Sequence, residues 1–338
     1  MTKNLKYTAL CLLVTLLASA CSKDGADGDA ATKPNEEAKE IRIQTNVTSV
    51  QNGTRATTID DNAALQTKDL KIDAYYHGTE TKYLDGTMLH YDSSWKFWIG
   101  SDPGAETHYY WPFEGSKVAG SSTDASTLDF VGFCPFENPA YIGTPTYNHE
   151  TGVLSFTCNM ITYMTLASQS SMQEFLVSVL PEQTLATQTA TEDGALPMVF
   201  KHPFALIKFT ITAASGTHVQ INSIKLTDLK TSGTCTYNGT TMTWTGQSGS
   251  AEMTIGQTLK YGTATTETTP FVVIPNNYGS KYLTVNATWD DWSNPVTISD
   301  YGTNVDFNWE PGHIYTYNQT HDKYALKVET EETFTEQW

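Results

Sequence analysis

Beyond residue 40, the chain is built from short segments in which apolar and polar residues alternate, and helical periodicity is almost absent. The segments are rich in Thr, Tyr and β-branched residues, and Gly, Asn, Asp or Pro separates them, as in strands joined by turns. The pattern predicts an all-β chain of two β-sandwiches. The expected strands cover residues 41–47, 70–76, 94–99, 127–133, 152–158, 175–180, 205–213, 218–226, 242–244, 271–274, 282–289, 296–298, 314–318 and 324–328.

The first 21 residues carry an export signal. Lys3 and Lys6 precede a short apolar stretch over residues 9–17, which is shorter than the roughly 20 residues that span a bilayer. Small residues then lead to Cys21, and this run resembles a bacterial lipobox. We therefore expect residues 1–20 to be a lipoprotein signal peptide and Cys21 to be lipidated, with several acyl chains anchoring the precursor in the outer membrane. The alternative is ordinary secretion with an accidental cysteine.

Composition also marks the domain limits. Residues 21–40 are small, polar and acidic, which predicts a flexible tether. Residues 181–197 are polar with a Pro at each end, and we expect a linker or a mobile loop there. The predicted domains are therefore residues 41–190 and residues 191–338. Residues 160–171 depart from the strand pattern and predict a loop or a short helix.

Charge and missing motifs exclude several function classes. The formal net charge of −17 repels phosphate backbones, so nucleic-acid binding is not expected. The eight histidines form no HxH or HExxH motif, and no GxSxG or phosphate-binding loop is present. We expect no metal, no cofactor and no catalytic residue. The pair Asp290–Asp291 fits a calcium or sugar site, and it fits a hairpin turn better.

The cysteines of the body are too few and too far apart for a disulfide framework. They are Cys134, Cys158 and Cys235, and no CxxC motif occurs. One disulfide is compatible with this number. Three buried free thiols are the favoured expectation.

A series of short motifs resembles the fimbrillin-like pilus subunits of Bacteroidales. After the lipobox they follow in order as TRA (54–56), YWP (110–112), LDFVGFCPFE (128–137), MQEFLVS (172–178), KHPFALIKFTI (201–211), FVVIPNN (271–277) and PGHIYTYN (311–318). The chain departs from the family at Glu174, where Asp is common, and at Asn276, where Gln is common. The resemblance implies two transthyretin-like, Greek-key β-sandwich domains in tandem. It also implies lipoprotein export, proteolysis of an N-terminal strand and polymerisation by strand exchange.

The segment 41–47 and the residues after it fit such processing. Ile41, Ile43 and Val47 would line one face of a strand, and the polar segment that follows holds Arg55, the only arginine after Arg42. We expect an arginine-specific protease to cut between Arg55 and Ala56. Removing residues 21–55 would expose an apolar groove with unpaired backbone groups.

The C-terminus has the pattern of a donor strand. Six side chains share one parity, Glu332 and Glu336 interrupt their face, and Pro is absent: Tyr324, Leu326, Val328, Thr330, Phe334 and Trp338. Such a strand would add to a neighbouring copy, and a head-to-tail contact of this kind builds filaments. The alternative is a terminal strand folded into its own domain. Stalk, tip and anchor roles in a surface fimbria supporting cell adhesion all remain open.

The tryptophans support a competing hypothesis, a surface glycan-binding lipoprotein that is also built from β-sandwiches. Indole rings stack on sugars, although aromatic residues in strands more often fill the core. A glycosidase is a third hypothesis, which no motif favours. The tryptophans concerned are Trp95, Trp98, Trp111, Trp244, Trp289, Trp292 and Trp309.

Overall fold

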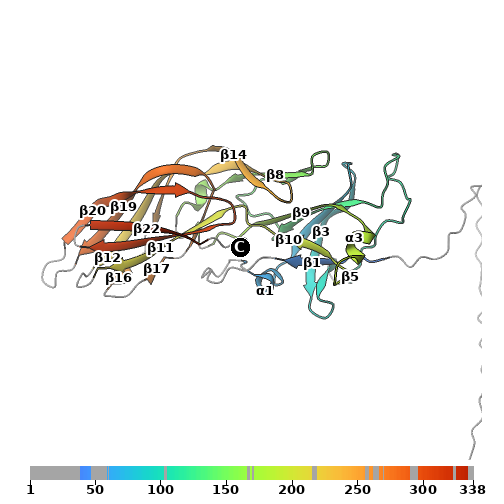
Figure 1. The fold of residues 1–338 in the computed structure, drawn as a ribbon, viewed down its shortest axis with the longest axis horizontal. Coiled ribbons are helices and arrows are strands. Elements are labelled where there is room, and N and C mark those ends of the chain that lie inside the picture. Colours follow the sequence, from blue (N-terminus) through green and yellow to red (C-terminus); the bar gives the residue numbers. More distant parts are fainter. Residues whose placement is uncertain are drawn as a thin grey trace, which may run out of the picture. The chain divides into compact units, whose positions relative to one another are not determined.

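The computed structural model describes the body of the chain, and residues 38–338 cluster as one compact unit. The described residues are 39–46, 59, 61–102, 105–165, 168–169, 171–214, 219–255, 259–261, 266–268, 270–289, 296–322 and 325–333. Strands dominate them, so the predicted all-β fold is confirmed (Figure 1). None of the helices in this part of the chain combines the length and apolarity that a bilayer crossing needs.

The first sheet has eight strands and contains the first strand of the described chain. Its order is β10-β1-β4-β3-β2-β6-β9, with β5 beside β4. Its strands are β1 (Ile43–Asn46), β2 (Leu70–Tyr76), β3 (Lys82–Asp92), β4 (Phe97–Asp102), β5 (Ala105–Thr107), β6 (Leu128–Cys134), β9 (Leu176–Gln183) and β10 (Leu196–Val199).

Strand β6 explains how this sheet joins two cores. All seven residues of LDFVGFC are buried. Leu128 and Phe130 face a cluster that includes residues of β1, β2 and β10, whereas Val131 and Phe133 face a second cluster. Strand β6 is therefore covered on both faces, which agrees with a sequence that is apolar except for Asp129.

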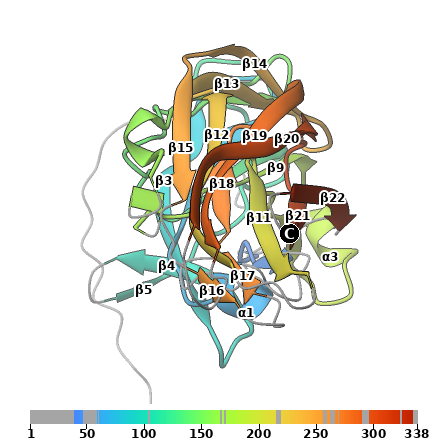
Figure 2. The ribbon, with the colours of Figure 1, turned by 90° about the vertical axis from the view of Figure 1, so that its left-hand side faces the viewer.

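Three further sheets surround the second cluster. The four-stranded sheet has the order β14-β13-β8-β7, one five-stranded sheet has β17-β11-β21-β22 with β18 on β11, and the other has β15-β12-β19-β20 with β16 on β12. Figure 2 shows strands of the two five-stranded sheets, including β11, β12 and β19. Their bounds are β7 (Thr146–Asn148), β8 (Val153–Asn159), β11 (Ala205–Ala213), β12 (Val219–Leu229), β13 (Ser232–Tyr237), β14 (Met242–Ser248), β15 (Ala251–Ile255), β16 (Leu259–Tyr261), β17 (Thr266–Glu267), β18 (Phe271–Val273), β19 (Asn277–Trp289), β20 (Val296–Asn308), β21 (Ile314–Asp322) and β22 (Ala325–Thr333).

The four-stranded sheet bears on the domain division. Strand β8 lies before residue 190 and pairs with β13, which lies after it, from Ser232↔Asn159 to Tyr237↔Leu154. Hydrogen-bonded strands of one sheet therefore come from both sides of the expected boundary. The division into residues 41–190 and 191–338 remains a prediction.

The segment expected to be a linker or a mobile loop is instead folded. Within residues 181–197, helix α3 (Leu185–Thr189) begins at Thr184, whose hydroxyl accepts the backbone N–H of Thr187 while the Thr187 hydroxyl accepts that of Thr184. Gln188 of this helix is 4% exposed. The polar composition of the segment reflects capping and one buried amide. Among the described residues, α1 (Asn62–Leu65) and a 3-10 turn (Ile161–Tyr163) are also helical, and the turn lies inside the predicted loop or short helix.

Strand β3 was absent from the expected strands because an Asp–Gly pair interrupts its pattern. Gly86 has φ +57°, a conformation that favours glycine, and the pairing of β2 with β3 shifts register there. Asp73 of β2 accepts the Gly86 N–H at 2.6 Å and a Lys82 Nζ hydrogen at 3.1 Å. A turn signal in the sequence is therefore a bulge in the sheet.

The cysteines and tryptophans serve packing. Cys134, Cys158 and Cys235 are buried and free, as favoured from the sequence, and burial raises the pKa of each thiol. Of the tryptophans that the structure describes, only Trp95 is exposed, at 58%. Trp98, Trp111, Trp289 and Trp309 are buried core residues. Trp292 and the pair Asp290–Asp291 lie outside the described residues.

Candidate functional site

Strand β1 lies inside the first sheet, with a hydrogen-bonded neighbour on each side. It runs parallel to β10, from Ile43↔Leu196 to Asn46↔Val199, and antiparallel to β4 at Ile43↔Trp98. Figure 1 shows β1 beside the far later strand β10. The strand that precedes all others in the described chain is thus an internal member of its sheet.

The inward face of this segment is buried, as its alternation predicted. Ile41, Ile43 and Thr45 are 7%, 2% and 6% exposed, while Gln44 and Asn46 are exposed. Burial of each isoleucine stabilises the fold by about 1.5–3 kcal/mol. Val47, the third member of the predicted face, lies outside the described residues. The apolar cluster beneath includes Leu84, Leu89, Trp98, Trp111, Leu196 and Met198.

Backbone hydrogen bonds continue the pairing at both ends of β1. Upstream, the Ile41 N–H donates to the Tyr109 carbonyl at 2.7 Å, and the Trp111 N–H donates to the Lys39 carbonyl at 2.8 Å. Downstream, the Phe200 N–H donates to the Asn46 carbonyl at 3.2 Å. The whole segment 39–46 is therefore held along its length by the main chain.

The buried side-chain amide of Gln188 hydrogen-bonds to the same segment. Its Oε1 accepts the backbone N–H of Arg42 and the indole N–H of Trp111, both at 3.0 Å. Its Nε2 donates to the Glu40 carbonyl at 2.9 Å. Because both contacts to the strand are to its backbone, Gln188 binds the segment without selecting its side chains.

Two side-chain contacts, in contrast, depend on the identity of the strand residues. The Trp98 indole N–H donates to the Thr45 hydroxyl at 3.0 Å, and both side chains are buried. The Arg42 guanidinium lies over the Phe97 ring, 5.0 Å from its centroid, in a cation–π contact.

The chain leaves β1 and returns close to it. The Asn62 side-chain amide donates to the Asn46 Oδ1 at 3.3 Å. Ile59 is buried, and its N–H donates to Glu174, which pairs with His202 at 2.8 Å. Arg55 and Ala56, the expected cleavage residues, lie between these points and outside the described residues, as does Cys21.

The last described strand, β22, occupies the edge of its sheet. Among the described strands it pairs with β21 alone, antiparallel from Ile314↔Thr333 to Asp322↔Ala325. Leu326 and Val328 are partly buried against the core, and Lys327 and Glu329 are exposed. The structure therefore pairs residues 325–333 within their own chain, as the alternative to a donor strand expected. Tyr324, Phe334 and Trp338 lie outside the described residues.

A buried titratable group lies in β21, the strand next to this edge strand. His321 of β21 pairs with Leu326 and is fully buried, and burial lowers its pKa to about 4. Its Nδ1 lies 2.6 Å from the Tyr301 hydroxyl and its Nε2 lies 3.1 Å from the Gln319 Oε1, so the neutral ring is satisfied when Tyr301 donates to it and it donates to Gln319.

Sequence reasoning found the β1 face but missed Gln188. Thr184 is a recognisable helix-cap residue, yet 146 residues separate Gln188 from Arg42 and no local pattern connects them. Among the described residues, no three His, Cys, Asp or Glu side chains gather where they would hold a metal ion. The best-defined feature of this region is strand β1 together with the groove that holds it.

Comparison with known proteins gives one family and several solved structures. A family model described as fimbrillin-like matches residues 54–338. A fimbrial protein from Bacteroides vulgatus ATCC 8482 is similar in structure, with a TM-score of 0.60, 12% identity, and coverage of 87% of this chain and 98% of that one. A protein from Bacteroides uniformis ATCC 8492, ascribed to cell adhesion, gives 0.45 and 15% over 87% and 98%. The fimbrial anchor protein Mfa2 from Porphyromonas gingivalis gives 0.35 and 10% over 88% and 97%. No curated protein matches the sequence.

Proposed function

This chain belongs to the fimbrillin-like family, and we propose that it is a structural subunit of a cell-surface fimbria that assembles by strand exchange and supports adhesion. The fold similarity to a fimbrial protein at a TM-score of 0.60 supports the structural role. The partners in this scheme are other fimbrial subunits, and the work of the protein is mechanical and adhesive. No enzymatic step by this chain is involved.

Export and anchoring come first in the proposed sequence. The signal at residues 1–20 directs the precursor out of the cell, and Cys21 carries the lipids that hold it in the outer membrane. An arginine-specific protease then cuts between Arg55 and Ala56. The hydrogen bond between Asn46 and Asn62 places the chain before and after the cut close together. Once the cut is made, β1 stays attached by noncovalent contacts alone.

The burial of β1 inside the first sheet is the observation that carries the proposal. When residues 21–55 leave, β4 and β10 both lose a partner, and the apolar cluster beneath Ile41 and Ile43 becomes exposed. An open groove with unpaired N–H and C=O groups is costly in water. Insertion of a strand from another copy restores both the hydrogen bonds and the burial.

Residues 324–338 are the proposed donor. Strand β22 is an edge strand, so its departure breaks pairing with β21 alone among the described strands of its sheet. It also exposes the partly buried Leu326 and Val328, which are apolar and ready to enter a groove. Because donor and groove lie at different places on the chain, the contact is head-to-tail and extends into a filament.

Cleavage of the purified precursor by an arginine-specific protease tests the scheme. We expect a new N-terminus at Ala56 by mass spectrometry, loss of residues 21–55, and a ladder of oligomers with fibres in negative stain. The matched control is Arg55→Lys, which keeps the charge and removes the arginine. A second variant lacking residues 324–338 should be cut and remain monomeric. A cut wild-type chain that sheds residues 21–55 and stays a stable monomer would refute the proposal.

A further inference from the structure

The first and last strands of the described chain carry matching residues. Residues 41–46 are IRIQTN, and residues 326–331 are LKVETE. At successive positions both have an aliphatic residue, a base, a β-branched aliphatic residue, a Gln or Glu, a Thr, and an Asn or Glu. Alternation alone is common to half-buried strands. The shared base and the shared threonine go beyond alternation.

We propose that LKVETE of one copy enters the groove of the next copy in the direction and register of β1. Leu326, Val328 and Thr330 then occupy the positions of Ile41, Ile43 and Thr45. This inference rests on the proposed strand exchange and specifies how the donor is seated.

The Trp98 indole sets the register. Its N–H is buried and donates to the Thr45 hydroxyl at 3.0 Å, so the departure of β1 removes an acceptor from a buried donor. In the proposed register, Thr330 restores that acceptor. A shift of two residues places Val328 or Glu332 there instead, which leaves the N–H unpaired or buries a carboxylate.

The other contacts to β1 are reproduced in the same register. Lys327 takes the place of Arg42 over the Phe97 ring, where a cation is attracted to the ring face. Gln188 binds the Arg42 N–H and the Glu40 carbonyl, and the equivalent groups of the donor are the Lys327 N–H and the Ala325 carbonyl. Trp111 keeps its hydrogen bond to the Gln188 Oε1, which holds the amide in position for either strand.

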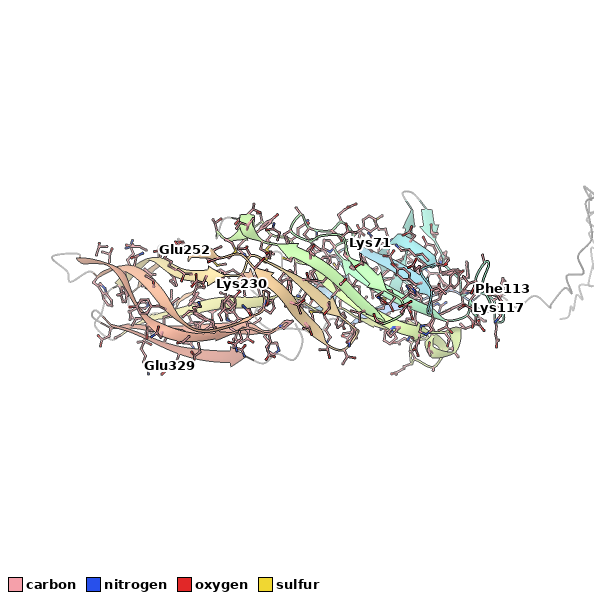
Figure 3. All side chains as sticks on the ribbon, turned by 90° about the horizontal axis from the view of Figure 1, so that it is seen from above. Lys71, Phe113, Lys117, Lys230, Glu252 and Glu329 are labelled. Carbon is pink, nitrogen blue, oxygen red and sulfur yellow. The ribbon has the colours of Figure 1, made fainter. Side chains whose placement is uncertain are left out.

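In its own sheet, the donor segment already buries the same side chains that it would bury in the groove. Leu326 and Val328 are partly buried in β22, while Lys327 and Glu329 are exposed at 72% and 66% of their side chains. Figure 3 shows Glu329 projecting outward from β22. The exposed positions of β1, Gln44 and Asn46, correspond to Glu329 and Glu331, so neither of these two carboxylates is buried in the transfer.

Cysteine pairs measure the register directly. In β1, Gln44 lies opposite Pro197 and Asn46 opposite Val199, so the donor should place Glu329 opposite Pro197 and Glu331 opposite Val199. Adjacent strands lie about 4.8 Å apart, within disulfide reach. A copy with Glu329→Cys is mixed after cleavage with a copy carrying Pro197→Cys, and Glu331→Cys is mixed with Val199→Cys. The cut chain holds only three native cysteines, all buried.

We expect both pairs to form disulfides on oxidation, and the crossed pairs Glu331→Cys with Pro197→Cys and Glu329→Cys with Val199→Cys to form few. Fibres that cross-link through residues 331 and 197 would overturn the register. Fibres in which Glu329→Cys cross-links to Pro197→Cys while a Lys327→Cys copy cross-links to Val199→Cys would overturn the direction. Cleaved chains that form no fibre at all would instead overturn the proposed function.

Synthetic peptides of residues 324–338 test the role of the threonine. The wild-type peptide should block fibre growth of the cleaved protein. Thr330→Val keeps the shape and removes the acceptor, and it should weaken inhibition about tenfold, whereas Thr330→Ser should restore most of it. Glu329→Gln, at a position that is exposed in β22 and corresponds to the exposed Gln44 of β1, is the control and should match the wild type. Equal inhibition by the valine and wild-type peptides would show that Trp98 does not set the register.

Discussion

The two terminal strands of the described chain, β1 and β22, have the same alternation but different positions. Strand β1 is internal, has neighbours on both sides and buries Ile43 at 2% exposure. Strand β22 is at an edge, has one neighbour and leaves Leu326 partly buried. Strand exchange needs this asymmetry. Departure of the replaced strand must expose a groove that is unstable in water, and the replacing strand must leave its own sheet with a smaller loss of free energy.

Truncating one inward-facing apolar residue of each strand should separate the stabilities of the two strands most strongly. Ile43→Ala in the uncut protein should lower the free energy of unfolding by about 3 kcal/mol, because it opens a cavity in a packed core. Leu326→Ala should cost less, about 1 kcal/mol, because its site is partly open to solvent. Urea unfolding followed by tryptophan fluorescence measures both. Equal losses would remove the asymmetry between the strands.

Removing the Gln188 amide that hydrogen-bonds to the β1 segment should have the next largest effect on stability. Gln188→Leu leaves the Arg42 and Trp111 N–H groups without their acceptor, and we expect a loss of about 2 kcal/mol. Hydrogen exchange should quicken in residues 39–46 and stay unchanged in residues 325–333. Gln183→Leu, at the last residue of β9 and outside this network, is the control. Unchanged exchange in residues 39–46 would show that backbone pairing alone holds β1.

Lowering the pH should destabilise the region of β22 rather than β1. Burial lowers the pKa of His321 to about 4 from 6.5, so the unfolded chain binds a proton that the folded chain does not as the pH falls below 6.5. The stability contributed by the neutral ring is complete above that pH and decreases progressively toward pH 4. We expect a loss of about 1 kcal/mol between pH 7.5 and pH 5.5, with faster exchange in β22 than in β1. His321→Gln should flatten this part of the pH profile. A profile unaltered by that substitution would exclude the histidine as its source.

The local sequence was sufficient for part of the site. Ile41 and Ile43 share a parity with Thr45, and that parity correctly predicted which face of residues 41–46 is buried. It could not predict the neighbours of β1, since the pairing with β10 joins residues about 150 positions apart. Gln188 was unpredictable for the same reason, because its partners lie in two distant parts of the chain, residues 40–42 and Trp111.

By itself, the sequence determined the all-β class, the buried face of residues 41–46, and the series of motifs that marks the family, because a period of two and a short motif are local properties. Only the tertiary structure decided that β1 is internal and β22 is at an edge. Both strands have the residues for either position. The choice between them depends on which distant strands supply hydrogen bonds, and that is set by the path of the whole chain through its sheets.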